Sequence, residues 1–262
     1  MRKIGVIGAG QMGGALIKGL IESGSIDATE IYVSGGNGQT AKNLQKQLKF
    51  TLCLSNVELV EKAEILILAV TPTIIPTILT EIKEVIQPDT LIISLAASML
   101  IQDYITILGS KVKLVRAIPN TPVSVLAGMT AVSYSESITE QDRDEVEELF
   151  QAVGEIVEVA EVQLASASTL SGCSPAFIAL FIEALADGGV LNGLSRKQAY
   201  LLAEQALLGT AKLALITGQH PGELKDDVCS PGGSTIKGVV ALEKHGFRNA
   251  VIQAIDAATK NE

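Results

Sequence analysis

The chain has 262 residues, of which 47% are hydrophobic, 19% are charged and only 3% are aromatic. This length and composition exclude a disordered chain and leave room for one large domain or two modest domains with an aliphatic core. The formal net charge of −9 argues against nucleic-acid binding, which requires a positive surface to neutralise phosphates.

Short strand patterns alternate with helical patterns in the first part of the chain. Strands are predicted over residues 4–7, 30–33, 50–54, 65–70, 91–95, 113–117 and 156–159, because these runs are rich in β-branched and apolar residues. Helices are predicted over residues 12–23, 40–48, 57–62, 75–86 and 140–153, with a further helix between the strands at 91–95 and 113–117 and Thr139 as the cap of the 140–153 helix. Such alternation is typical of a doubly wound, mostly parallel sheet.

The pattern becomes entirely helical after Val162. Helices are predicted over residues 175–192, from the cap Ser195 to the stop Gly218, after His220-Pro221, and in a last pattern that ends at His245-Gly246. The predicted fold class is therefore α/β, with a Rossmann-type domain over residues 1–161 followed by an all-α domain over residues 162–262.

The predicted helix 175–192 is apolar on more than one face, with Glu183 and Asp187 as its charged residues. A domain of about 100 residues has little core in which to bury such a helix. One interpretation is burial against another subunit, which predicts at least a homodimer. The other is a central core helix within one monomer.

A glycine-rich turn, Gly8-Ala9-Gly10-Gln11-Met12-Gly13, connects the first predicted strand to the first predicted helix. Gly8 permits a tight turn, Gly10 has no side chain to block a pyrophosphate, and Gly13 lets helix and strand pack closely. The phosphates would meet free N–H groups at the helix N terminus, which adds Gln11 and Met12 to the cofactor-binding candidates. The alternative is a turn that packs on the sheet without a ligand, but this context favours a dinucleotide-dependent oxidoreductase.

The second predicted strand lacks the terminal acidic residue that NAD sites usually carry. It continues as Ser34-Gly35-Gly36-Asn37, so no carboxylate there repels a 2′-phosphate, and Ser34 and Asn37 can donate hydrogen bonds to one. Asn56 follows the third strand as a further candidate. We therefore expect NADPH, with NADH as the alternative donor because the usual arginine is absent. Ser, Gly and Asn are also ordinary turn residues.

Two further loops follow strands at the carboxyl edge, where ligands bind in such sheets. Val70-Thr71-Pro72 follows the central strand, which makes Val70 and Pro72 cofactor-binding candidates. Pro119-Asn120-Thr121-Pro122 is a stiff loop from which Asn120 and Thr121 could border the nicotinamide. The alternative for this second loop is a rigid connection between strands.

The segment Ser230-Pro231-Gly232-Gly233-Ser234-Thr235 precedes a predicted helix. The adjacent glycines expose backbone N–H groups and the helix dipole adds positive potential, which together suit a small carboxylate. The hydroxyl groups of Ser230, Ser234 and Thr235 are nearby donors. The alternative is an ordinary helix cap with a glycine-rich lead-in.

The apolar runs, the cysteines and the histidines limit the possible location and reaction type of the protein. The apolar runs are interpreted as too short or too interrupted to cross a bilayer, and the three separated cysteines predict neither a disulfide framework nor a metal site, so a cytoplasmic location is expected. His220 and His245 both lie at predicted helix ends, where structural roles explain them. A substrate that needs little acid–base help, such as a cyclic imine, fits this inventory.

With these motifs in place, the chain resembles the pyrroline-5-carboxylate reductase family along essentially its whole length. The resemblance is carried by Gly8–Gly14, by Ala69-Val70-x-Pro72, by Arg116-x-x-Pro119-Asn120-Thr121-Pro122, by Ser171-Gly172-x-x-Pro175-Ala176-Phe177, by Glu183-Ala184-x-Ala186-Asp187-Gly188-Gly189-Val190, by Gly193-Leu194, and most specifically by the segment from His220 to Thr235.

The resemblance implies reduction of Δ1-pyrroline-5-carboxylate to L-proline, the last step of proline biosynthesis, by NADPH or NADH. It implies that the backbone of the 230–235 loop holds the substrate carboxylate, with Gly232 and Gly233 among the substrate-binding residues. It implies that Thr235, the expected catalytic residue, contacts the ring nitrogen, and that Ala69 joins the cofactor site. It also implies intertwined dimers, often assembled into decamers.

Two departures from the family pattern concern binding sites. Cys173-Ser174 stands where the family usually has Ser-Gly, and Thr71 stands where Lys is usual. One rival function is a β-hydroxyacid dehydrogenase, but the catalytic Lys of that family would fall at Ala176. A second rival is a non-catalytic NADP-binding sensor, which has no need of a carboxylate loop.

Overall fold

The computed structural model describes residues 2–35 and 39–259, and the chain divides into two compact units. The first unit ends at Gly172 and the second begins at Cys173. The domain boundary expected from the sequence between residues 161 and 162 stays a prediction. The two units are described separately below.

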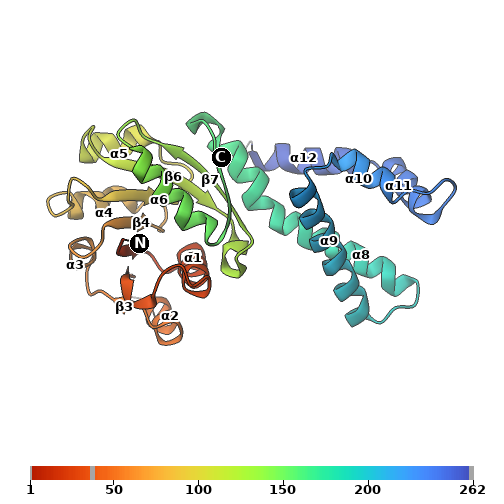
Figure 1. The fold of residues 1–262 in the computed structure, drawn as a ribbon, viewed down its shortest axis with the longest axis horizontal. Coiled ribbons are helices and arrows are strands. Elements are labelled where there is room, and N and C mark those ends of the chain that lie inside the picture. Colours follow the sequence, from red (N-terminus) through yellow and green to blue (C-terminus); the bar gives the residue numbers. More distant parts are fainter. Residues whose placement is uncertain (1, 36–38, 260–262) are drawn as a thin grey trace. The chain divides into compact units, whose positions relative to one another are not determined.

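The first unit is built on an eight-stranded sheet in the order β3-β2-β1-β4-β5-β6-β7-β8 (Figure 1). The strands are β1 (Ile4–Ile7), β2 (Ile31–Ser34), β3 (Thr51–Leu52), β4 (Ile65–Leu68), β5 (Leu91–Ser94), β6 (Lys113–Pro119), β7 (Gly128–Tyr134) and β8 (Gly154–Glu158). Strands β1 to β6 are parallel, β7 pairs antiparallel with β6, and β8 runs parallel to β7. The predicted doubly wound, mostly parallel sheet is confirmed.

Helices cover both faces of this sheet, and each face has its own aliphatic core. Helices α1 (Gln11–Glu22), α2 (Thr40–Leu48) and α6 (Glu140–Gln151) pack on one face. Helices α3 (Asn56–Val60), α4 (Ile75–Ile82) and α5 (Ile101–Leu108) pack on the other. The central strands are buried on both sides, which is why β4 is the uninterrupted apolar run Ile65-Leu66-Ile67-Leu68. Helix α7 (Leu164–Ser168) lies near the end of the unit.

Strand β7 was not predicted from the sequence. It pairs with β6 from Pro119 opposite Thr130 to Val115 opposite Tyr134. The strand mixes Gly, Thr and Ser with apolar residues, and five of its seven residues are buried, including the polar Thr130 and Ser133. It therefore shows neither the alternation nor the continuous apolar run that identifies a strand in a sequence.

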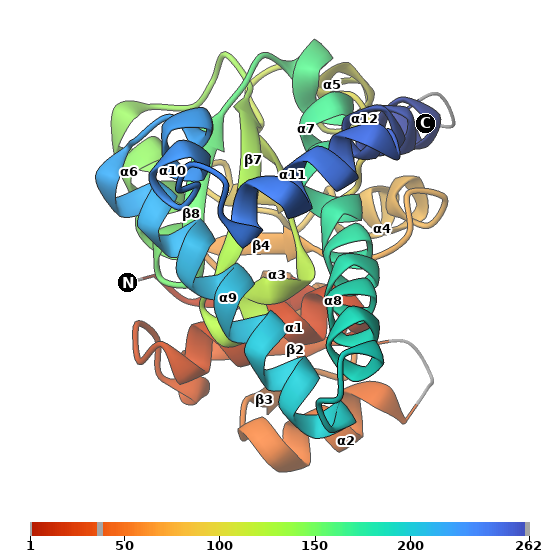
Figure 2. The ribbon, with the colours of Figure 1, turned by 90° about the vertical axis from the view of Figure 1, so that its right-hand side faces the viewer.

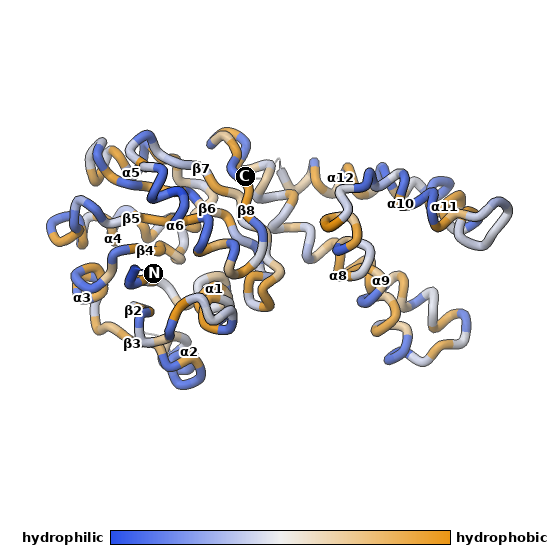
Figure 3. The backbone as a smooth tube through the Cα atoms, in the orientation of Figure 1, coloured by the Kyte–Doolittle hydropathy of each residue, from blue (hydrophilic) through white to orange (hydrophobic). Residues whose placement is uncertain are grey.

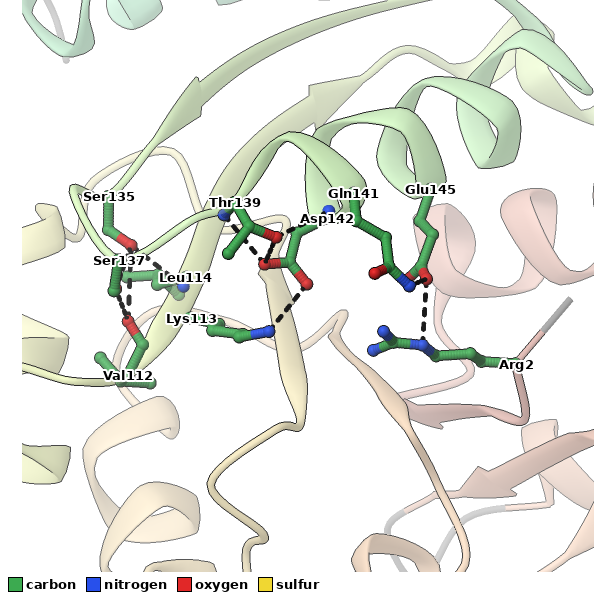
Figure 4. A network of polar contacts seen from close by, with 10 residues as sticks. All are labelled: Arg2, Val112, Lys113, Leu114, Ser135, Ser137, Thr139, Gln141, Asp142 and Glu145. Atoms are coloured by element: carbon green, nitrogen blue, oxygen red, sulfur yellow. Dashed lines mark hydrogen bonds and ion pairs between the residues drawn. The ribbon is translucent and has the colours of Figure 1, made fainter.

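Thr139 caps α6 as predicted, in a polar network that also reaches β6 (Figure 4). The Thr139 hydroxyl accepts from the Asp142 N–H at 3.2 Å, and the Thr139 N–H donates to the Asp142 carboxylate at 2.9 Å. Lys113 forms an ion pair with the other oxygen of Asp142 at 3.1 Å. Burial raises the pKa of Asp142, but hydrogen bonds from Thr139 and Lys113 outweigh it and hold the pKa below its ordinary value.

Asp142→Asn should lower the free energy of unfolding at neutral pH by about 1–3 kcal/mol, because the charged partner of the Thr139 cap and its ion pair with Lys113 are lost. A lowered native pKa stabilises the fold above the unfolded-state value of about 3.9 and ceases to do so as pH falls through the native value. The difference in melting temperature between wild type and variant should therefore shrink on acidification. Asp144→Asn, an exposed change on the same helix, is the control and should show no such trend.

The described part of the second unit is entirely helical. It contains α8 (Ser174–Leu191), α9 (Arg196–Thr217), α10 (Pro221–Asp227), α11 (Ser234–Lys244) and α12 (Phe247–Thr259). The Ser195 hydroxyl caps α9, and Gly218 ends it in a left-handed conformation at φ 63°, as predicted. The last helix predicted from the sequence ends at His245-Gly246, and α12 beyond it is not predicted.

Helices α8 and α9 form a hairpin through the short turn 192–195 (Figure 2). The two helices contact each other through small side chains, with Ala186, Ala199 and Ala203 buried. Both helices contain hydrophobic stretches (Figure 3). Most of their larger apolar residues are exposed, including Ile178, Leu180, Leu201, Leu202, Leu208, Leu215 and Ile216. The interpretation of the first of these helices as the core of a monomer is therefore wrong.

The stretches Glu161–Leu191 and Arg196–Thr217 are long and apolar enough to meet the length and hydropathy criterion for a membrane span. The expectation that no apolar run is long enough is wrong for these two stretches. Length and composition alone do not distinguish a membrane span from a helix that packs against another protein chain.

Candidate functional site

The glycine turn between β1 and α1 is held by close backbone contacts. Gly8 has φ 107°, and a Cβ there would collide with the carbonyl oxygen of Ala69. A Cβ on Gly13 would collide with the carbonyl oxygen of Gly8. The Gly8 N–H donates to the carbonyl of Ser34 at 2.9 Å, which fixes the turn beside the end of β2. Both glycines are therefore required by the protein's own packing.

Gly10 is different, because a Cβ at this position would meet nothing within 4 Å. Its φ of −73° is open to any residue, and it is the N-cap of α1 without a side-chain cap hydrogen bond. Neither packing nor backbone conformation explains a glycine here. Open space beside the uncapped N–H groups of a helix is what a bound pyrophosphate requires.

Two hollows flank this turn at the carboxyl edge of the sheet. One encloses about 450 Å³ and is lined by Gly8, Ser34, Gly35, Leu54, Asn56, Val70, Ile74 and Glu81, among others. The other encloses about 370 Å³ and is lined by Gly8, Ala9, Gly10, Gly35, Thr40, Ala69, Val70 and Thr71, among others. The fold thus gathers most of the predicted cofactor residues around one edge.

At the end of β2 the Ser34 hydroxyl donates to Oδ1 of Asn56 at 2.5 Å. The Asn56 amide in turn donates to the carboxylate of Glu81 on α4 at 2.8 Å. Ser34 and Asn56 are predicted from the sequence, but Glu81 is not, because nothing in the spacing of α4 marks it. The predicted donor Asn37 and its neighbour Gly36 lie outside the described residues.

The Asn120 side chain makes two hydrogen bonds within the first unit. Its Oδ1 accepts from the Met129 N–H at 2.8 Å, and its Nδ2 donates to the carbonyl of Ser171 at 3.0 Å. Ser171 lies in a π-helical turn, Thr169–Cys173, of the kind that often occurs at functional sites. Asn120 thus ties the start of β7 to this turn, and its expected contact with the nicotinamide stays a prediction.

Arg116 on β6 is buried and holds the same edge of the sheet. Its Nη1 forms an ion pair with Glu161 at 2.9 Å, and its Nη2 donates to the carbonyl of Ala97. The same Glu161 oxygen accepts from the N–H of Ile101 at 2.7 Å. Arg116 therefore connects the loop after β5 to the segment that follows β8.

In the second unit, the 230–235 loop turns before α11. The Gly233 N–H donates to the carbonyl of Ser230 at 3.0 Å, and Gly232 has φ 69°, a conformation that favours glycine. Gly233 is the N-cap of α11 and makes no side-chain cap hydrogen bond in the described structure. The first N–H groups of this 11-residue helix are thus open to an anion, and Ser234 and Thr235 are exposed beside them.

Comparison with known proteins bears on these features directly. Residues 161–262 match the family model described as pyrroline-5-carboxylate reductase dimerisation, and residues 3–98 match one described as NADP oxidoreductase, coenzyme F420-dependent. The chain is 42% identical over 254 residues to the pyrroline-5-carboxylate reductase of Escherichia coli K12, which covers 97% of this chain and 94% of that protein. The chain belongs to the pyrroline-5-carboxylate reductase family.

Solved structures of the family agree with the fold. The Plasmodium falciparum pyrroline carboxylate reductase with NADP bound has a TM-score of 0.88 at 33% identity, and the alignment covers 99% of this chain and 96% of that one. The Coxiella burnetii pyrroline-5-carboxylate reductase has a TM-score of 0.90 at 33% identity, with 99% and 97% covered. Fold class and family, both expected from the sequence, are confirmed.

The dimerisation model of the pyrroline-5-carboxylate reductases covers α8 and α9. This match explains why these helices leave large apolar side chains exposed in a single chain. Burying one such side chain contributes about 1.5–3 kcal/mol, so burying several of them at an interface offsets part of the entropy cost of association. Oligomerisation through this unit, expected from the sequence, is supported.

Gly10→Val tests whether the glycine turn of this reductase-family protein is shaped for a ligand. The valine enters open space, so the free energy of unfolding should fall by no more than about 1 kcal/mol, the effect of a poorer N-cap. The affinity for NADPH, measured by calorimetry, should fall by more than about tenfold, because the side chain occupies the pyrophosphate position. Gly13→Ala is the contrasting variant and should lower the melting temperature. Unchanged NADPH affinity in Gly10→Val would contradict the assignment.

Proposed function

We propose that this protein reduces the C=N bond of Δ1-pyrroline-5-carboxylate to L-proline by hydride transfer from NADPH, the last step of proline biosynthesis. The proposal rests on family membership over nearly the whole chain. The observation that carries the cofactor assignment is the open space at Gly10. Packing does not require a glycine at this position, whereas a bound pyrophosphate would. NADPH supplies the hydride, and the chain's residues bind and orient the reactants.

The cofactor site proposed here comprises the turn residues Gly8, Gly10, Gln11, Met12 and Gly13. Ser34 and Asn56 are proposed to hold the adenosine ribose, and Ala69, Val70, Pro72 and Asn120 to lie along the rest of the dinucleotide. The hollows beside Gly8 support the first two groups, since they join the turn to Ser34, Asn56, Ala69 and Val70. Pro72 and Asn120 follow from their loops at the same edge.

The substrate site proposed here is the loop of Ser230, Gly232, Gly233, Ser234 and Thr235. The open N–H groups at the start of α11 bind the substrate carboxylate, and the Thr235 hydroxyl contacts the ring nitrogen. A protonated imine accepts hydride without a strong protein base. This fits the histidines, because His220 caps α10 by accepting from the Gly222 N–H at 3.1 Å.

We further propose a soluble cytoplasmic homodimer formed through α8 and α9, with a decamer as the larger assembly. The exposed apolar residues of these helices support the dimer. The decamer is implied by the family resemblance, and the cytoplasmic location by the three separated cysteines, which form no disulfide framework.

The assay that tests the proposal follows absorbance of the reduced nicotinamide when Δ1-pyrroline-5-carboxylate is added with NADPH. Turnover with the imine and none with 3-hydroxy acids and NADP⁺ is the expected result. The reverse pattern would identify the β-hydroxyacid dehydrogenase function, whose lysine is replaced by Ala176 here. NADPH binding without turnover of either substrate would identify a sensor.

Thr235→Ala should lower kcat by about a hundredfold, the usual contribution of one positioned proton donor. NADPH affinity measured without substrate should be unchanged, because Thr235 belongs to the substrate loop. Thr235→Ser keeps the hydroxyl and should retain most of the activity. Equal rates for wild type and the alanine variant would remove Thr235 from the mechanism.

A further inference from the structure

A chain of three polar side chains forms part of the wall of the 450 Å³ hollow. Ser34 comes from the end of β2, Asn56 from the start of α3, and Glu81 from the last turn of α4. Their hydrogen bonds are 2.5 Å from the Ser34 hydroxyl to Asn56 and 2.8 Å from the Asn56 amide to Glu81. In doubly wound sheets the end of the second strand contacts the adenosine ribose, so this chain lies where NADPH and NADH differ.

The direction of these hydrogen bonds decides what the chain offers a ligand. The Ser34 proton is committed to Asn56, which leaves the Ser34 oxygen as an acceptor. One N–H of the Asn56 amide is committed to Glu81, whose carboxylate is itself acceptor-only. A ribose 2′-hydroxyl can donate a hydrogen bond to the Ser34 oxygen or to the Glu81 carboxylate. The fully ionised 2′-phosphate of NADPH has no proton to donate to either of them.

The charged side chain that lines the hollow also disfavours a bound phosphate. Glu81 is the charged side chain among the lining residues, and no Lys or Arg lines either this hollow or its neighbour in the described structure. The N terminus of α2 at Thr40 lines the neighbouring hollow and favours an anion through its dipole. Glu81 opposes that attraction, because a carboxylate repels a phosphate dianion.

We propose that Glu81 is a specificity-determining residue that weakens the preference for NADPH over NADH, by orienting Asn56 and by placing a negative charge beside the 2′-phosphate position. The sequence shows no carboxylate at the end of β2 and only the amide of Asn56 after the third strand. The fold supplies that carboxylate from α4. The inference rests on the proposed function, because it assigns Glu81 a role at the dinucleotide site proposed there.

Two substitutions separate the charge of Glu81 from its role in orientation. Glu81→Gln removes the charge but keeps an oxygen that can accept from Asn56, and Glu81→Ala removes both. Glu84→Gln is the matched control, because Glu84 is an exposed acid just beyond α4 that lines neither hollow. The dissociation constants of NADPH and NADH are measured by calorimetry for each full-length variant and for wild type.

Glu81→Gln should raise the ratio of NADPH to NADH affinity by about fivefold to tenfold, as expected when one like-charge repulsion at a solvent-exposed site is removed. Glu81→Ala should raise it at least as far, since Asn56 can then turn its amide toward the phosphate. Glu84→Gln should leave the ratio unchanged. Raising the salt concentration should shrink the difference between wild type and Glu81→Gln, because the repulsion is screened.

The inference is overturned if Glu81→Gln changes both affinities equally, moves the ratio toward NADH, or matches Glu84→Gln. These measurements use binding without substrate, so they stand apart from catalysis. Absence of imine turnover in a protein whose cofactor ratio responds to Glu81 would refute the proposed reaction and leave the selectivity role intact.

Discussion

The carbonyl oxygen of Gly8 lies so close to Gly13 that α1 can begin where it does only if residue 13 lacks a Cβ. This contact sets the position of the first helix on the sheet, and with it the direction in which the N–H groups at its start point. The bond from the Gly8 N–H to Ser34 then fixes the end of β2 against the same turn. The hollows, the Ser34–Asn56–Glu81 chain and the open space at Gly10 all depend on that arrangement.

Two helix N termini in different units carry the proposed chemistry. At α1 and at α11 the N-cap residue is a glycine, so no side chain of that residue caps the first N–H groups of the helix. Backbone N–H groups and helix dipoles can bind anions with little reorganisation, so a protein of net charge −9 can still hold a dinucleotide and a carboxylate. An imine that becomes an iminium on protonation places few further demands on the protein, which agrees with histidines confined to helix ends.

Local pattern predicted much of this fold, and long-range contact explains what it missed. Strands such as β4 and caps such as Thr139 and Ser195 are encoded in neighbouring residues, so they were predicted. Strand β7 was missed because the sheet buries its polar residues together with its apolar ones, so its sequence shows no alternating pattern. Glu81 was missed because it approaches Asn56 across 25 positions of chain, and no spacing rule joins two helices on one sheet face. The spacing of the glycines predicted both glycine loops as binding sites, but it did not point to Glu81, whose proposed role depends on the fold.

Hydride transfer from the nicotinamide to the imine carbon is tested most directly by isotope transfer. The protein is incubated with Δ1-pyrroline-5-carboxylate and NADPH deuterated at both hydride positions of C4, and the product is analysed by mass spectrometry and NMR. Direct hydride transfer predicts proline with one deuterium, at the ring carbon that was doubly bonded to nitrogen. Proline without deuterium at that carbon, or no proline at all, would contradict it.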